Sequence, residues 1–135
     1  MVLGVGHIGI LVRDLDESAR LYHEMFGATL VEVKVVEEQG VKVGMLSFQH
    51  GPHLELLEPL PNSRMASALE KRGEGVQHIS FDVDDIERDL ARLKDTMVSL
   101  IDETPRQGVE GRVAFLHPRS TNGVLVELCQ KEQQS

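Results

Sequence analysis

The chain has 135 residues, of which 41% are hydrophobic, enough for one compact domain or two small modules that share a core. Its formal net charge of −8 argues against nucleic acid or an anionic membrane as a partner, because both need a basic face. No apolar run approaches the ~20 residues of a membrane span and nothing resembles a signal peptide, so we expect a cytoplasmic protein. A single cysteine excludes an internal disulfide framework, and Cys129 is interpreted as a buried thiol in the last strand.

In chain order, a first module of about residues 3–58 is predicted to have the element order β-α-β-β-β. Its helix is predicted from Asp14, a good N-cap, followed by apolar residues at helical spacing up to Phe26 and by Gly27 as a stop. Its strands are predicted from β-branched residues and from apolar alternation. The expected elements are a strand over 5–12 that contains His7, a helix over 15–26, strands over 30–36 and 41–48, and a strand that carries Glu55.

A linker of about residues 59–75, with a short helical pattern near 65–71, leads into a second module of about residues 76–130. The second module repeats the first: Asp85 is the predicted cap, and apolar residues at helical intervals continue to Met97. The polar tail from Gln130 is expected to fray. The expected strands cover 76–83, 99–102, 112–117 and 123–129, and loops are expected at 107–111 and 117–123.

The chain has the pattern of a tandem duplication. In each half a His followed by Ile lies early in a strand, and a lone Glu lies inside a later apolar strand. His78 follows His7 by 71 residues (78 − 7), and Glu127 follows Glu55 by 72 (127 − 55). Four potential metal ligands therefore occur as two matched pairs.

The repeated residues point to a metal site. A carboxylate among apolar neighbours is costly unless a positive group meets it. If the two modules face each other about a pseudo-twofold axis, the four side chains converge, and a cation between them supplies the compensation. Two imidazoles and two carboxylates suit a borderline divalent ion such as Co, Ni, Zn or Mn. A single His or Glu of this kind is more often structural, and it is the repetition that favours a metal site. His53, next to a turn, is expected to be exposed, and His23, His50 and His117 are interpreted as structural or solvated.

Five segments resemble the methylmalonyl-CoA epimerase family of the vicinal oxygen chelate superfamily, which also holds glyoxalase I: HIGILVRDLDESARLYHEMFGA, LELLEPL, LEKRGEGVQHISFDVDDI, IDETPRQG and FLHPRSTNGVLVEL. The resemblance implies an α+β fold in which two tandem βαβββ modules form a curved, mostly antiparallel sheet around a central metal site. It also implies a divalent metal, most often cobalt, a homodimer and a small-molecule acyl-CoA substrate of propionate metabolism. The implied reaction interconverts (R)- and (S)-methylmalonyl-CoA through a metal-stabilised enolate.

Carried over by position, His7, His78 and Glu127 match the metal ligands of the family. Glu55 stands where some members have Gln, and those members have a Glu, thought to be a catalytic base, where this chain has Val43. We therefore expect His7, Glu55, His78 and Glu127 as metal ligands. The missing carboxylate would have moved to Glu55, which resembles the His-Glu-His-Glu set of glyoxalase I, and Glu55 and Glu127 would be the catalytic acid and base.

Two other functions stay open. A glyoxalase I-type isomerase (a lactoylglutathione lyase) uses the same ligand set, and a metal-free small-molecule-binding module uses the same fold. A ring-cleaving dioxygenase is disfavoured, because that class binds iron with two His and one Glu and does not need Glu55.

Overall fold

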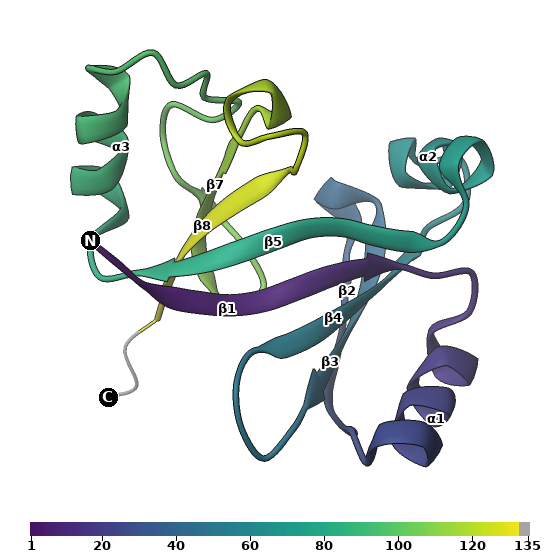
Figure 1. Cartoon of the computed structure of the whole chain (residues 1–135). Coiled ribbons are helices and arrows are strands. Elements are labelled where there is room, and N and C mark those ends of the chain that lie inside the picture. Colours follow the sequence, from purple (N-terminus) through teal and green to yellow (C-terminus); the bar gives the residue numbers. More distant parts are fainter. Residues whose placement is uncertain (133–135) are drawn as a thin grey trace. The chain divides into compact units, whose positions relative to one another are not determined.

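The computed structural model describes residues 1–132, which contain three α-helices, two short 3-10 helices and eight strands (Figure 1). The predicted α+β class is confirmed. The chain divides into two compact units: one is residues 7–77, and the other is residues 1–6 together with the chain from His78 onward. The predicted boundaries of the two modules and of their linker stay a prediction. Within residues 1–132, no helix combines the length and the apolar character needed to cross a membrane.

The unit of residues 7–77 contains the second half of the first strand and a four-strand arrangement in the order β2-β3-β4-β1. β2 pairs with β3 and β3 with β4 in antiparallel fashion, whereas β1 and β4 are parallel. Helix α1 packs against β2, β3 and β4 (Figure 1). The elements are β1 (Val2–Leu11), α1 (Leu15–Phe26), β2 (Thr29–Val36), the 3-10 helix η1 (Glu37–Gln39), β3 (Val41–Ser47), β4 (His53–Pro59) and α2 (Arg64–Arg72).

The second unit repeats this plan, with the strand order β5-β8-β7-β6. Here β5 and β8 are parallel, and the pairs β7/β8 and β6/β7 are antiparallel. Helix α3 packs against β7 and β8, as α1 packs against the strands of its own unit. The elements are β5 (Gly75–Val83), α3 (Ile86–Lys94), β6 (Arg106–Gln107), β7 (Gly111–Leu116), the 3-10 helix η2 (Pro118–Ser120) and β8 (Val126–Lys131). Each unit thus has one parallel and two antiparallel pairings, in agreement with the mostly antiparallel pattern expected.

Each helix covers only one face of its strands. In the first unit, Leu15 of α1 is fully buried in a cluster with Leu46 and Leu56 of the strands. Gly44 lies directly beneath it, because a Cβ at this glycine would meet Leu15 Cδ2 at 2.8 Å. Because side chains alternate along a strand, the odd-numbered residues of β4, Glu55 among them, lie on the opposite face. The second unit has the same division, with α3 packed over the even-numbered residues of β8.

Both helices begin as the sequence predicts. Asp14 accepts a hydrogen bond from the Glu17 backbone N–H at 3.0 Å, and Asp85 accepts one from the Arg88 N–H at 3.1 Å. Each carboxylate satisfies an N–H that has no partner inside its helix and places a negative charge at the positive end of the helix dipole. The predicted helix over 15–26 is confirmed to the residue.

The predictions for the second module were wrong in three places. The expected strand over 99–102 is reduced to an isolated bridge at Leu100, because the Asp102 side chain accepts the Phe115 N–H at 2.9 Å in place of a backbone carbonyl. A two-residue strand, β6 (Arg106–Gln107), is found where the sequence predicted the start of a loop at Gln107. The helix expected to reach Met97 ends at Lys94 and leaves Met97 98% exposed. The Thr96 hydroxyl donates to the Leu93 carbonyl at 2.6 Å, which satisfies a carbonyl of the last turn.

The last strand is also displaced from its expected span of 123–129. It begins only at Val126, because the Thr121 hydroxyl donates to the Val124 carbonyl at 2.6 Å and holds the preceding residues in a turn. Asn122 and Gly123 both have positive φ in this turn, a conformation that these two residue types tolerate best. The strand then continues to Lys131, so Gln130, which was expected to fray, is part of β8.

Candidate functional site

The first unit holds a buried imidazole–carboxylate pair on the face of the sheet that α1 leaves uncovered. His7 is 2% exposed and Glu55 is 6% exposed. His7 Nε2 and Glu55 Oε2 lie 3.0 Å apart. The parallel register of β1 and β4 sets this distance, because it pairs His7 with His53 and Gly9 with Glu55 and so puts these residues on one face. Burying a carboxylate is costly unless a positive group compensates its charge, so this pair can bind a cation.

The second unit places its predicted residues by the same rule. His78 is 4% exposed and Glu127 is 7% exposed. β5 and β8 pair Ser80 with Glu127, so Glu127 lies opposite the residue two positions after His78. In the first unit, Glu55 lies opposite Gly9, two positions after His7. The duplication read from the sequence is therefore present in the strand register of both units.

An aromatic contact positions the second histidine. The rings of His78 and Phe115 are in edge-to-face contact, with the ring centroids 5.8 Å apart and the planes at 80°. Phe115 is the residue of β7 that pairs with Glu127, so His78, Phe115 and Glu127 share the face that α3 leaves uncovered. Such an edge-to-face contact favours this orientation of the imidazole.

The sequence reasoning missed a second matched pair, which holds the carboxylate-bearing strands in place. Glu58 Oε1 accepts the backbone N–H of Leu15, the first residue of α1, at 2.8 Å. Gln130 Oε1 accepts the N–H of Ile86, the first residue of α3, at 2.9 Å. Both acceptors stand three residues after the repeated Glu, and both bond an N–H that the helix itself leaves unsatisfied. The shared offset from Glu55 and Glu127 is the signal that could have revealed them.

The other four histidines lie outside the two repeated His–Glu pairs, and one expectation about them was wrong. His53 was expected to be exposed but is half-buried, because it is the first residue of β4 and pairs in register with the buried His7. His23 Nδ1 lies 2.8 Å from the Ala28 carbonyl oxygen at the end of α1. His117 Nδ1 accepts the Arg119 N–H at 3.1 Å at the start of η2. His50 is exposed.

The only cysteine is confirmed as a buried thiol. Cys129 is 1% exposed and lies in β8. Burial, and to a lesser extent the charge of Glu127, raises the pKa of Cys129 to about 12. The thiol is therefore protonated at neutral pH, which argues against a role as nucleophile because only the thiolate is reactive.

Val43 occupies a position next to the first pair. β3 and β4 pair Met45 with Glu55 and Val43 with Leu57, so Val43 lies on the same face as Glu55 and diagonal to it. Val43 is 3% exposed. A longer acidic side chain at this position would therefore extend along the same buried face as Glu55.

Comparison with known proteins agrees with these features. A family model described as the Glyoxalase/Bleomycin resistance protein/Dioxygenase superfamily matches residues 6–115. The mitochondrial methylmalonyl-CoA epimerase of Dictyostelium discoideum is 38% identical over 135 residues, a match that covers 96% of this chain and 81% of the relative. The crystal structure of methylmalonyl-CoA epimerase from Mycobacterium tuberculosis has a TM-score of 0.92 at 35% identity and covers 98% and 90% of the two chains. A methylmalonyl-CoA epimerase in complex with methylmalonyl-CoA and NH4+ has a TM-score of 0.91 at 37% identity and covers 97% and 96%.

Proposed function

This chain belongs to the Glyoxalase/Bleomycin resistance protein/Dioxygenase superfamily, and on that premise we propose that it is an epimerase that interconverts (R)- and (S)-methylmalonyl-CoA. Relatives that it matches over most of their length are named methylmalonyl-CoA epimerases. The observation that carries the proposal is the repeated arrangement of a buried His and a buried Glu, in the same parallel register in each unit.

We propose that His7, Glu55, His78 and Glu127 hold one divalent metal ion. His7 and Glu55 form a buried imidazole–carboxylate pair in one unit, and His78 of the other unit is also buried. Glu127 is included because it repeats the position of Glu55 in its own unit. Nitrogen and carboxylate donors fit Co, Ni, Zn or Mn better than Ca or Mg, which prefer oxygen ligands alone. Cobalt is the ion that the family resemblance favours.

The substrate chemistry explains why a metal is useful. The C2 hydrogen of methylmalonyl-CoA lies between a thioester carbonyl and a carboxylate. When bound, a divalent ion supplies Lewis-acid stabilisation of the negative charge that develops on these oxygens as C2 loses its proton, an effect of several kcal/mol.

The chain itself must move two protons. Inversion at C2 requires that one group removes the proton from one face and that another delivers a proton to the opposite face. We assign these two tasks to Glu55 and Glu127, since they are the two repeated carboxylates and are held on different strands. One carboxylate oxygen accepts the C2 proton, the other Glu donates its proton to C2, and the reverse reaction exchanges the two roles. Positioned proton transfer of this kind contributes about 10²- to 10⁴-fold in rate.

The experiment that tests the proposal compares two substrates. Purified protein is first analysed for its metal content and then assayed with (S)-methylmalonyl-CoA and with the hemithioacetal of methylglyoxal and glutathione. The proposal expects a bound divalent metal and turnover of methylmalonyl-CoA alone. Turnover of the hemithioacetal alone would make the protein a glyoxalase I-type isomerase. Metal-free protein without either activity would make it a small-molecule-binding module.

We further propose that the protein acts in the cytoplasm as a homodimer. An exposed apolar surface on β2, the outermost strand in the order β2-β3-β4-β1, supports the dimer. Val33 and Val35 alternate along this strand on one face and are 44% and 56% exposed. Replacing both valines with Lys should convert a dimer into a monomer in light scattering. An unchanged dimer would place the interface on another surface.

A further inference from the structure

One face of α2 gathers cations in a chain that is otherwise strongly acidic. Its members share one side of the helix, because they are spaced by three, four, seven and eight residues from the first of them. We call this surface the α2 cationic face, and it consists of Arg64, Ser67, Ala68, Lys71 and Arg72. Its three cations are exposed, and none forms an ion pair with an acidic residue of the described chain. By contrast, Arg88, Arg92 and Arg112 are each paired with a carboxylate.

Helix stability does not account for all three cations. Lys71 and Arg72 stand in the last turn of α2, where positive charge is favoured by the helix dipole. Arg64 is the first residue of the same helix, where the dipole disfavours a cation. The face is therefore cationic along its whole length, at some cost to the helix at one end.

Two hollows adjoin this face. One, of about 340 Å³, is lined by the five residues of the α2 cationic face. The other, of about 180 Å³, lies between the end of α2 and the start of β5, and Ala68 and Arg72 line it as well. The two hollows are therefore neighbours on the helix, and Ala68 and Arg72 line both of them.

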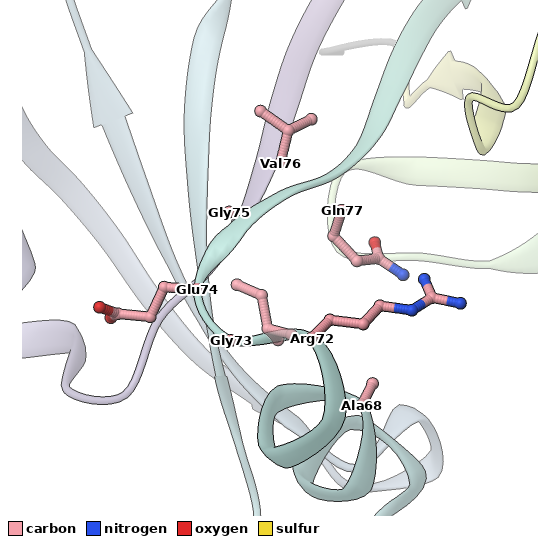
Figure 2. A pocket seen from close by; sticks show the side chains of 8 residues that line it. Ala68, Arg72, Gly73, Glu74, Gly75, Val76 and Gln77 are labelled. Carbon is pink, nitrogen blue, oxygen red and sulfur yellow. The ribbon is translucent and has the colours of Figure 1, made fainter.

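The side chains around the smaller hollow leave the Arg72 guanidinium without a counter-charge. Figure 2 shows the side chains of Arg72 and Gln77 extending to the same side of the chain, whereas Glu74 points to the opposite side. The Glu74 carboxylate accepts the Arg13 backbone N–H at 2.9 Å instead. Glu70, the other acid nearby in sequence, lies off the cationic face, because at about 100° per residue it is rotated about 120° around the helix axis from Arg64.

This hollow and the candidate site lie along the same face of β1. Leu11 lines the hollow and stands four residues after His7 on the same strand face. At about 3.3 Å per residue, this places the hollow about 13 Å along the strand from His7. A substrate whose reacting carbon lay near His7 and Glu55 could reach the hollow only through a long arm, and the pantetheine arm of coenzyme A is such a group.

We propose that the α2 cationic face binds the phosphate groups of the acyl-CoA substrate, an inference that rests on the proposed function. The planar guanidinium groups of Arg64 and Arg72 match phosphate oxygens in a two-pronged contact, and Lys71 adds a point charge. The Ser67 hydroxyl adds a neutral donor between the cations. The face thus supplies the positive charge that a highly anionic substrate needs on a protein of net charge −8.

The test separates the phosphates from the rest of the substrate. The variant Lys71→Ala/Arg72→Ala is compared with Arg20→Ala/Lys94→Ala, which removes two exposed cations elsewhere, one of them also at a helix C-terminus. Calorimetry measures the Kd for coenzyme A, and kinetics measure the KM for methylmalonyl-CoA and for methylmalonyl-pantetheine, which lacks the phosphates of the nucleotide. The proposal expects at least a tenfold rise in Kd and KM for the coenzyme A compounds in the first variant only. The KM for methylmalonyl-pantetheine should stay unchanged in both variants.

Two outcomes would overturn the proposal: equal affinity for coenzyme A in both variants, or a rise in KM that is the same for both substrates, which would indicate a general structural effect. Arg64→Ala, at the other end of the helix, should raise the Kd for coenzyme A in the same direction. Wild-type protein that binds coenzyme A through this face without turning over methylmalonyl-CoA would contradict the proposed function and leave the phosphate site standing.

Discussion

Replacing Glu55 with Gln removes one charge from the candidate site with almost no change in side-chain shape. The residue is 6% exposed and its Oε2 lies 3.0 Å from His7 Nε2, so the amide keeps a polar contact with the imidazole. Core packing is thus preserved, and at equal metal content the change removes the carboxylate that is assigned to accept and donate the C2 proton. An acid or base of this kind contributes about 10²- to 10⁴-fold, which corresponds to about 3 to 5 kcal/mol of transition-state stabilisation.

The strand register provides a route to restore the function. Val43 lies diagonal to Glu55 on the same face, and diagonal neighbours across an antiparallel pair are about 7–8 Å apart, within reach of a long side chain. The double variant Val43→Glu/Glu55→Gln moves the carboxylate to the position where some members of the family have it. We expect this double variant to be at least tenfold more active than Glu55→Gln. The matched control is Val43→Gln/Glu55→Gln, which has the same size and no charge.

The assay follows deuterium incorporation at C2 of methylmalonyl-CoA by NMR in deuterated water, at equal metal content for each variant. Glu55→Gln should exchange the C2 hydrogen at least 100-fold more slowly than the wild type, and both kcat and kcat/KM should fall. Exchange at the wild-type rate in Glu55→Gln would remove this residue from proton transfer. Equal rates in the two double variants would refute the argument that a carboxylate at position 43 can substitute for Glu55.

Three further predictions concern the second carboxylate, the core under α1 and the start of that helix. Glu127→Gln should also slow C2 exchange by about 10²-fold or more, and unchanged exchange would remove Glu127 from the mechanism. Leu15→Ala should lower the free energy of unfolding by about 2–5 kcal/mol in chemical denaturation, because the side chain is fully buried. Leu21→Ala on the same helix, where the side chain is 51% exposed, should cost about 1 kcal/mol or less, and equal losses would contradict the core assignment. Glu58→Ala should cost about 1–3 kcal/mol in the same measurement, because the Leu15 N–H loses its acceptor, and a neutral result would show that water replaces it.

The duplication could be predicted from the sequence because its most informative residues break a local pattern. A carboxylate inside an apolar strand is conspicuous, and its recurrence at Glu55 and Glu127, together with His7 and His78, made the four residues a set. The structure adds that each Glu lies opposite the residue two positions after its His. Strand pairing decides this register, and a single strand gives no sign of its partner.

The features that could not be predicted depend on side chains that replace backbone hydrogen bonds. Asp102 takes the place of a carbonyl opposite Phe115, which shortens the expected strand at 99–102. Glu58 and Gln130 reach the first N–H of a helix from the end of a strand. A polar residue at a strand end is common, so neither has a pattern of its own, and only the comparison of the two modules makes them visible.

The central claim is that one divalent ion, held by two imidazoles and two carboxylates, makes the C2 proton of methylmalonyl-CoA removable. The most direct measurement is C2 deuterium exchange by NMR with three samples of the same protein: as purified, stripped with a chelator, and restored with cobalt. The account predicts that exchange is lost in the stripped protein and returns when about one cobalt ion per chain is bound. Exchange that continues at the original rate in the stripped protein would contradict it.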